Sequence, residues 1–255
     1  MTALDRPSVA VVIPALNEAA TIRGVVADVL AVCPHVIVVD DGSSDGTAER
    51  IADLPVTLLR HAAPRGKGQA LRDGFREALA QGHDAVVTMD ADGQHAAADV
   101  PRLLAAARAF PDHLVIGARL RGREQQPTGR RRANAVADWG ISWACGLPVA
   151  DTQSGQRYYP RRVLERVDLA ADDFVFEAAI LIVAARECGL GILSVPIQVR
   201  YPEGGGSHFR PVRDIARITC HTIASVIRYG DVIASYRRSH GRAPQVFDPA
   251  GLRVT

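Results

Sequence analysis

The chain has 255 residues, of which 47% are hydrophobic and 23% charged, and its formal net charge is +2. This length and composition predict a globular, enzyme-sized protein with one large domain, or one domain with an appendage. Aromatic residues make up only 5% of the chain. No recognition-helix or RNA-binding signature accompanies the basic residues, which argues against a nucleic-acid partner.

The four cysteines lie far apart without a CxxC pair, which argues against a disulfide framework or a zinc site and indicates reduced thiols. The first apolar run is short and broken by Pro14, unlike a signal peptide. No stretch approaches the roughly 18 apolar residues that a membrane span needs. We therefore expect a cytoplasmic protein, with the cytoplasmic face of a membrane as the alternative location.

Apolar strand-like runs alternate with segments of helical periodicity along the first part of the chain. The strand-like runs are Val9 to Ile13, Val36 to Val39 and Ala85 to Met89. The helical stripes include Ile22, Val25 and Val29, and then Leu71, Phe75 and Leu79. This alternation predicts an α/β fold with a central, mostly parallel sheet flanked by helices. Ligands of such sheets bind beyond the carboxyl ends of the strands, where the loops beginning at Pro14, Asp40 and Asp90 are expected.

The first acidic loop runs from Asp40 to Thr47. Ordinary turn chemistry and helix capping explain Gly42 and Asp45 well. They explain Asp40 and Asp41 less well, because two adjacent carboxylates at the end of a buried strand repel each other unless something binds there.

The second acidic loop, Asp90 to His95, is the stronger candidate for a metal site. Its one-residue spacing places Asp90 and Asp92 near a single strand end. Hard oxygen ligands suit Mg²⁺ or Mn²⁺. Such a cation would bridge diphosphate oxygens and neutralise a leaving nucleotide.

Four motifs occur in a characteristic order: Pro14 to Glu18, Val38 to Thr47, Arg65 to Gly68, and Asp90 to His95. Together they resemble the family 2 inverting glycosyltransferases of the GT-A fold, and most of all the dolichyl- or polyprenyl-phosphate mannosyltransferase branch. The resemblance spans residues 9–201. It implies a metal-dependent hexosyltransferase that moves a sugar from GDP-mannose or a UDP-hexose to a polyprenyl, dolichyl or similar lipid phosphate.

The resemblance also implies roles for residues on the donor side. Metal ligation is expected of Asp90, Asp92 and Gln94, with Mg²⁺ or Mn²⁺ as the cofactor. Contact with the nucleotide sugar is expected of Pro14, Leu16, Glu18, Asp41, Lys67, Asp90, Ala91 and Glu177. The segment around Lys67 is equally explained as a flexible turn, and Glu177 as a solvated helix residue.

On the acceptor side, Arg119 matches an arginine beside the donor and acceptor phosphates. The segment Ser154-Gly155-Gln156-Arg157 resembles the SGFR segment that positions the acceptor phosphate, with Gln156 in place of phenylalanine. The acceptor phosphate is therefore assigned to Arg119, Ser154 and Arg157, and catalysis to Asp92, Arg119, Arg157 and Arg200. A glycine-rich loop follows Arg200, with His208 where the family commonly has lysine.

Whether the reaction needs a proton acceptor depends on the class of acceptor substrate. A hydroxyl acceptor usually needs a carboxylate base, whereas a phosphate is already anionic at neutral pH. The chain lacks the Glu-Asp pair of hydroxyl-using relatives, which favours a phosphate acceptor. The alternatives are a hydroxyl acceptor with Asp172 or Asp173 as base, a nucleotide-sugar-binding protein without turnover, and a nucleotidyltransferase. The last normally begins with a glycine-rich loop that this chain lacks.

Arginines gather in two segments of the chain. Residues 119–132 hold six arginines and one glutamate, and residues 200–242 hold eight arginines and three acidic residues. Many of these arginines are equally explained as solvated surface groups. Their clustering outside the acidic half favours a phosphorylated substrate or an anionic membrane surface.

We divide the chain into a catalytic domain (1–212), an amphipathic helical segment (213–240) and a polar tail without an assignable role (241–255). The helical segment has an apolar stripe with arginines at its margins, which suits a membrane surface. A helix packed on the catalytic domain, or a homodimer contact, would show nearly the same pattern. Trp139 and Trp143, four residues apart, are interpreted as a packed helix face.

Overall fold

The computed structural model describes residues 7–121, 128–169, 173–198 and 211–249. The predictions about Asp172, Arg200, His208 and the glycine-rich loop concern residues outside these ranges. So does most of the basic segment between Arg121 and Thr128.

Seven strands form one sheet in the part of the chain that the structure describes. The strands are β1 (Val9–Ala15), β2 (Val36–Asp40), β3 (Thr57–Arg60), β4 (Ala85–Thr88), β5 (His113–Arg121), β6 (Arg157–Pro160) and β7 (Gly191–Gln198). Their order across the sheet is β3-β2-β1-β4-β6-β5-β7, and only β6 runs antiparallel to its neighbours. The prediction of a mostly parallel sheet is confirmed.

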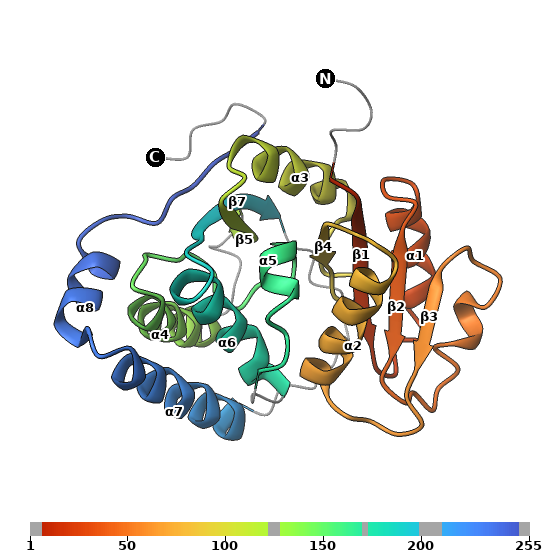
Figure 1. The fold of residues 1–255 in the computed structure, drawn as a ribbon. Coiled ribbons are helices and arrows are strands. Elements are labelled where there is room, and N and C mark those ends of the chain that lie inside the picture. Colours follow the sequence, from red (N-terminus) through yellow and green to blue (C-terminus); the bar gives the residue numbers. More distant parts are fainter. Residues whose placement is uncertain (1–6, 122–127, 170–172, 199–210, 250–255) are drawn as a thin grey trace.

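Helices cover both faces of this sheet (Figure 1). They are α1 (Ile22–Leu30), α2 (Lys67–Ala80), α3 (Val100–Ala109), α4 (Thr128–Cys145), α5 (Arg161–Leu164), α6 (Asp173–Arg186), α7 (Pro211–Tyr229) and α8 (Val232–His240). Two short 3₁₀ turns, Glu49–Ile51 and Ala97–Asp99, complete the regular structure of the described ranges.

The sheet separates two hydrophobic cores. Along β1, Ala10 and Val12 belong to the core that contains Phe75 and Phe176, whereas Val11 and Ile13 belong to the core that contains Leu103. Successive side chains of a strand point to opposite faces, so a strand covered on both sides must be apolar throughout. This explains the continuous apolar run in the sequence.

The antiparallel strand β6 decides where the candidate site forms. Its first residue, Arg157, pairs with Thr88 of β4 and with Ile116 of β5. Because β6 runs in the opposite direction, its beginning lies at the sheet edge where β4 and β5 end. The segment before Arg157 therefore lies beside the loop that starts at Asp90.

The helices α7 and α8 pack on α4, and α7 also packs on α6 (Figure 1). The predicted segment of residues 213–240 thus corresponds closely to a helix beginning at Pro211 and a helix ending at His240. Among the residues described, no helix is both long and apolar enough to cross a membrane.

The residues after α8 return to the sheet. The backbone amide of Ser194 in β7 donates to the carbonyl of Gln245 at 2.9 Å, and that of Phe247 donates to the carbonyl of Ser194 at 2.9 Å. The Phe247 ring packs against Phe110 with centroids 5.2 Å apart. Although the sequence analysis found no role for this segment, the structure gives it a packing role on β7.

Candidate active site

The first acidic loop is held together by its own hydrogen bonds. The amide of Glu18 donates to Oγ1 of Thr47 at 2.8 Å, and the amide of Ala19 donates to Oδ2 of Asp45 at 3.0 Å. Asp45 also accepts from the amide of Thr47 at 3.0 Å. These bonds join the loop after β1, which carries the predicted pocket residues Leu16 and Glu18, to the loop after β2, whereas the third predicted residue, Pro14, is buried within β1.

The carboxylate of Asp40 is only partly satisfied by the protein. Its Oδ1 accepts from the amide of Ser43 at 2.9 Å, whereas its buried Oδ2 has no hydrogen-bond partner among the described residues and lies 3.3 Å from Nε of Arg60. The Arg60 guanidinium therefore offsets part of the negative charge at this strand end.

Asp41 organises the loop that leads into α2. Its two carboxylate oxygens accept from the amides of Arg65 and Gly66, both at 2.8 Å, and Nδ1 of His61 lies 2.7 Å from Oδ1. In this arrangement Asp41 orients the backbone immediately before Lys67. Its predicted contact with the nucleotide base stays a prediction.

A partly buried cluster of charges joins α2, the Asp90 loop and α6. Nζ of Lys67, the first residue of α2, lies 2.7 Å from Oδ1 of Asp90 and 3.1 Å from Oε2 of Glu177 on α6. The side chain of Glu177 is only 14% exposed. The cluster thus brings together three residues that the sequence analysis placed at the nucleotide sugar.

The electrostatics of this cluster favour the charged forms. Burial opposes the charge of Lys67, but Asp90 and Glu177 outweigh it and raise the lysine pKa. Burial likewise opposes the charge of Asp90, but Lys67 and His95 outweigh it and hold the carboxyl pKa far below its usual range. Asp90 is therefore an anion at neutral pH.

Asp92 has a different environment. Its Oδ1 accepts from the amide of Gln94 at 2.9 Å. Burial, and then the negative charge of Asp90, raise the pKa of Asp92 above the usual value. A cation beside both carboxylates would relieve this repulsion.

The donor atoms at this edge fit a divalent cation that is shared with a ligand. Within the described ranges, no three His, Cys, Asp or Glu side chains are grouped to hold a metal by themselves. Mg²⁺, however, is commonly held by one or two carboxylates together with phosphate oxygens of a substrate. Asp90 and Asp92 provide such a pair of carboxylates, two residues apart at the end of β4.

The segment before β6 packs directly on the acidic loop. A Cβ atom at Gly155 would lie 2.3 Å from Oδ2 of Asp90, so a side chain there would displace either Asp90 or the 154–157 backbone. Oγ of Ser154 donates to the carbonyl of Gly117 at 2.5 Å. The buried amide of Gln156 donates from Nε2 to the carbonyl of Ala96 at 3.2 Å.

Arg157 is fully buried and bonded within the protein. It donates to the carbonyls of Thr152 and Ser154, both at 2.7 Å, to the carbonyl of Glu177 at 2.8 Å, and to the hydroxyl of Tyr159 at 3.2 Å. A contact with the acceptor phosphate would require the guanidinium to leave these partners. In this arrangement Arg157 fixes the shape of the 152–157 segment and attaches it to α6.

Arg119 forms a buried ion pair near the end of β5. Its Nε and Nη2 donate to the two carboxylate oxygens of Asp151 at 2.8 and 2.6 Å, and its backbone amide donates to Asp151 at 2.6 Å. Asp151 has a positive φ of 55°, which aspartate tolerates better than most residues. Asp138 of α4 in turn accepts from the amides of Thr152 and Asp151 at 2.7 and 3.2 Å.

The sequence analysis did not identify Asp138 or Asp151 as site residues. Both support the predicted acceptor segment, residues 154–157, which begins three residues after Asp151. The polar pair Asp151-Thr152, separated from Ser154 only by Gln153, was the available signal. Asp138 lies in the middle of a helix and carries no comparable signal.

Comparisons with known proteins agree with this geometry. The family model described as "Glycosyl transferase family 2" matches residues 10–168. The polyprenol monophosphomannose synthase of Mycolicibacterium smegmatis is 34% identical over 77% of this chain and 79% of its own length. The undecaprenyl-phosphate mannosyltransferase of Micrococcus luteus is 32% identical over 86% of this chain and 92% of its own length.

Among solved structures, the chain is similar to the glucosyl-3-phosphoglycerate synthase of Mycobacterium tuberculosis in complex with Mn²⁺, UDP and phosphoglyceric acid. The TM-score is 0.65 at 25% identity, and the match covers 88% of this chain and 79% of that one. The mannosyl-3-phosphoglycerate synthase of Rubrobacter xylanophilus has a TM-score of 0.67 at 20% identity, covering 97% of this chain and 79% of that one.

Proposed function

We propose that this chain, which belongs to glycosyl transferase family 2 and is a glycosyltransferase of the GT-A fold, moves a hexose from a nucleotide-sugar donor to a polyprenyl-type lipid phosphate. The observation that carries the proposal is the contact of Gly155 with Asp90. It joins the acceptor segment directly to the carboxylate expected to face the donor diphosphate. The names of the two relatives, a polyprenol monophosphomannose synthase and an undecaprenyl-phosphate mannosyltransferase, support this acceptor class.

On the donor side, the nucleoside would lie against Pro14, Leu16, Glu18 and Asp41, and the sugar near Lys67, Ala91 and Glu177. Asp90 and Asp92, with Gln94 beside them, would hold Mg²⁺ or Mn²⁺ together with the diphosphate. The bound cation would stabilise the negative charge of the departing nucleoside diphosphate. The Mn²⁺ and UDP of the solved relative support this assignment, and the names of the mannosyltransferases make GDP-mannose the other candidate donor.

Lys67 has a specific part in this proposal. Its ammonium lies 2.7 Å from Oδ1 of Asp90. A diphosphate beside Asp90 would offer the same ammonium a third anionic partner, after Asp90 and Glu177, so Lys67 can bind the donor without moving far. Glu177, at 3.1 Å from the ammonium, keeps Lys67 charged and directed at the site.

The chemistry needs no general base from this chain. An anionic oxygen of the acceptor phosphate attacks the anomeric carbon from the face opposite the leaving group. The bond from that carbon to the diphosphate oxygen breaks as the new bond to the acceptor forms, which inverts the anomeric configuration. Arg119 lies at the predicted acceptor side, where the Asp151 carboxylate orients its guanidinium.

A second candidate acceptor is a small phosphorylated acid. The solved relative bound to phosphoglyceric acid favours this reading. In that reaction the nucleophile would be a hydroxyl, and a carboxylate base would be needed. The two candidate acceptors therefore give different products: the sugar is joined to a lipid phosphate in one case and to a hydroxyl of phosphoglyceric acid in the other.

Transfer from radiolabelled GDP-mannose or UDP-glucose tests the proposal, with undecaprenyl phosphate or phosphoglyceric acid as acceptor and with Mg²⁺, Mn²⁺ or a chelator. We expect label in the organic phase only when a cation and the lipid phosphate are both present. Asp92→Asn should remove it. Asp112→Asn, a change at a carboxylate that is 79% exposed, should not. Label that appears only in phosphoglyceric acid would replace the lipid acceptor with the second candidate.

A further inference from the structure

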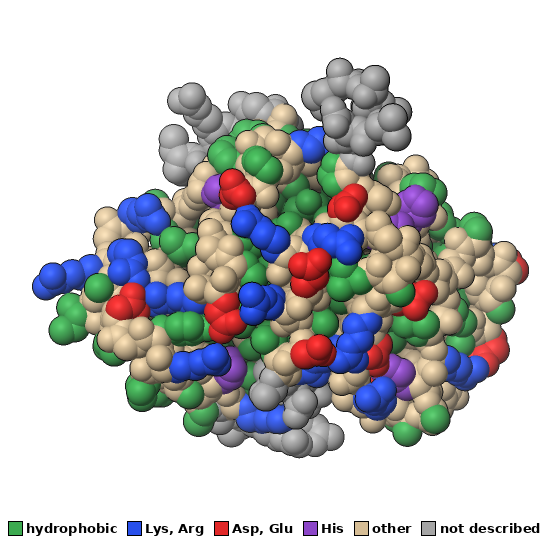
Figure 2. All heavy atoms as spheres, viewed as in Figure 1, with side chains coloured by type: hydrophobic (Ala, Val, Ile, Leu, Met, Phe, Trp, Pro, Cys, Tyr) green, Lys and Arg blue, Asp and Glu red, His purple; other side chains and the backbone are tan. Residues whose placement is uncertain are grey.

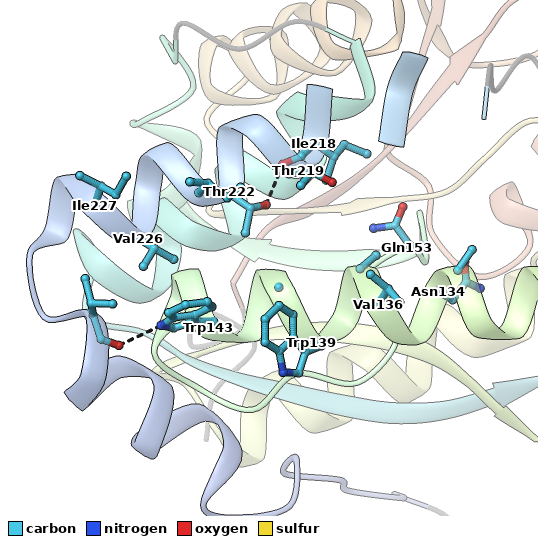
Figure 3. Close-up of a pocket in the computed structure, with 15 residues that line it drawn as sticks. Asn134, Val136, Trp139, Trp143, Gln153, Ile218, Thr219, Thr222, Val226 and Ile227 are labelled. Carbon is cyan, nitrogen blue, oxygen red and sulfur yellow. Dashed lines mark hydrogen bonds between the residues drawn. The ribbon is translucent and has the colours of Figure 1, made fainter. Parts of the chain in front are cut away.

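An apolar groove of about 400 Å³ lies between α4 and α7, with Val232 of α8 at its edge. Figure 3 shows its walls: Val136, Trp139 and Trp143 come from α4, and Ile218, Val226 and Ile227 come from α7. Several of these side chains are exposed, with Val136 and Ile227 each 68% accessible to solvent. The groove is therefore open to a ligand from outside.

The walls of the groove offer little to a polar ligand. None of the residues that line it is charged. Nε1 of Trp143 already donates to the carbonyl of Val232 at 2.9 Å, and Oγ1 of Thr222 donates to the carbonyl of Ile218 at 2.8 Å (Figure 3). A peptide would bring backbone groups that need partners, whereas a hydrocarbon needs none.

One end of the groove reaches the candidate active site. Gln153 lines this end, opposite the end formed by Ile227 (Figure 3). Gln153 directly precedes Ser154 and Gly155, and Gly155 packs on the Asp90 carboxylate. A molecule with a polar head at Asp90 and Arg119 would therefore have its apolar part at the mouth of this groove.

We propose that the groove between α4 and α7 binds the hydrocarbon chain of the acceptor lipid, so that the acceptor phosphate emerges at Gln153 beside the acceptor segment. This inference rests on the proposed function, because it extends the same acceptor site. It commits to an isoprenoid chain as the occupant. Three observations support it: the walls are uncharged, Trp143 and Thr222 bond within the protein, and the groove is continuous with the 153–157 segment.

The two tryptophans of the chain provide a direct binding signal, since both line the groove. Farnesyl phosphate in detergent-free buffer serves as the probe, and dimethylallyl phosphate, with a single isoprene unit, serves as its short counterpart. We expect a saturable change of tryptophan emission with farnesyl phosphate and a much weaker response to the short compound. A linear, non-saturating response to both would overturn the proposal.

Two variants locate the binding site. Ile223→Glu places a carboxylate in the wall of the groove, which should raise the half-saturation concentration for farnesyl phosphate by roughly tenfold or more, because a charge is costly among apolar groups. Ile233→Glu is the matched control, since Ile233 is 69% exposed on α8 and does not line the groove. Equal effects of the two variants would overturn the proposal.

Transfer assays separate this inference from the proposed function. The quantity to compare is the kcat/KM for farnesyl phosphate divided by the kcat/KM for dimethylallyl phosphate. If the groove and the proposed function both hold, Ile223→Glu lowers this ratio roughly tenfold and Ile233→Glu leaves it unchanged. Turnover of both acceptors with an unchanged ratio in Ile223→Glu overturns the groove but keeps the function. A saturable tryptophan signal without turnover of either acceptor supports the groove and overturns the function.

A second copy of the chain is the competing occupant. Light scattering would then show a dimer for the wild type and a monomer for Ile223→Glu, and farnesyl phosphate would give no saturable signal with either protein. This combination would make the groove a subunit contact and overturn the proposal. A wild type that stays monomeric and binds the probe supports the proposal.

Discussion

At the scale of single residues, Gly155 links the two halves of the candidate site. Its missing side chain lets the backbone approach the Asp90 carboxylate, because a Cβ there would lie 2.3 Å from Oδ2. Gly155→Ala must therefore displace either the acceptor segment or Asp90. We expect it to abolish the shift in melting temperature that a nucleotide sugar with Mn²⁺ produces, while the protein stays folded by circular dichroism.

Gly24→Ala is a matched control for this prediction. Gly24 lies inside α1, and a Cβ there meets nothing within 4 Å. Alanine is a better helix former than glycine by about 1 kcal/mol, so this variant should melt slightly higher and keep its response to the nucleotide sugar. A Gly155→Ala protein that still responds as the wild type does would show that the close approach to Asp90 has no role in donor binding.

The Arg119–Asp151 pair gives a second prediction at this scale. Burial alone would raise the pKa of Asp151, but the hydrogen bonds and charge of Arg119 outweigh it and lower the pKa below its usual range. Arg119→Met removes the partner and leaves the carboxylate buried. We expect the free energy of unfolding to fall by roughly 3–5 kcal/mol at pH 7.

The pH dependence of this loss has a defined sign. In the wild type the lowered pKa stabilises the fold at pH values above the ordinary aspartate pKa, and this contribution disappears as the pH falls through the lower, folded-state value. In Arg119→Met the uncompensated burial raises the pKa of Asp151 instead, so protonation relieves the strain. Denaturant unfolding should show a smaller difference between the two proteins at pH 4 than at pH 7. A constant difference across this range would mean that Asp151 is not the group responsible.

At the scale of secondary-structure elements, the segment after α8 binds the sheet through a buried carboxylate. Asp248 has a side chain only 1% exposed, and it lies 3.1 Å from Nη2 of Arg102 and 2.6 Å from Nη2 of Arg121. Arg121 ends β5, two residues after Arg119. The last described part of the chain thus anchors the strand that carries Arg119, the arginine predicted to lie on the acceptor side.

Asp248→Asn tests this anchor. It keeps the size of the side chain but removes the charge that pairs with two arginines, which should cost roughly 2–4 kcal/mol of unfolding free energy. We also expect faster proteolytic cleavage after α8, because the segment would detach more often. Asp168→Asn, at a carboxylate that is 81% exposed, should leave both measurements nearly unchanged. An Asp248→Asn protein as stable and resistant as the wild type would argue against anchoring.

These elements also show which features the sequence could predict. Strands β1, β2 and β4 were predicted because strands buried on both faces need continuous apolar runs. The Asp90 loop was predicted because its carboxylate spacing is local. Other contacts join residues far apart in the chain: Val246 and its neighbours pair with β7, and Asp248 pairs with Arg121. No local sequence pattern predicts such contacts. The burial of Arg157 escaped prediction for a related reason: although Thr152 and Ser154 are near in the chain, they accept from it only because the loop folds back over the start of β6, and Glu177 comes from α6.

At the scale of the whole molecule, exposed apolar side chains gather on one helical layer. Of the eight large hydrophobic residues exposed in the described ranges, seven lie on α4, α7 and α8, and only Val32 lies elsewhere. Basic side chains such as Arg228, Arg237 and Arg238 occur on the same helices. On the face in Figure 2, positive and negative side chains are interspersed rather than gathered into one basic area. A surface of this kind suits a membrane interface better than nucleic acid.

We therefore expect the protein to associate peripherally with anionic vesicles. Flotation with phosphatidylglycerol vesicles should recover the protein at low salt, and recovery should fall as salt screens the arginines.

Ile227→Glu and Ile233→Glu remove side chains that are 68% and 69% exposed. Each should lower the partition coefficient roughly tenfold, because the insertion of an isoleucine contributes about 1.5–3 kcal/mol. Their melting temperatures should stay close to that of the wild type. Val32→Glu changes the one large exposed apolar residue that the described ranges place outside the layer, and it should float as the wild type does. If flotation is lost at high salt but is unchanged by both isoleucine substitutions, charge alone attracts the protein to the vesicles. The exposed apolar side chains of α4, α7 and α8 would then serve the proposed lipid-chain groove and not membrane insertion.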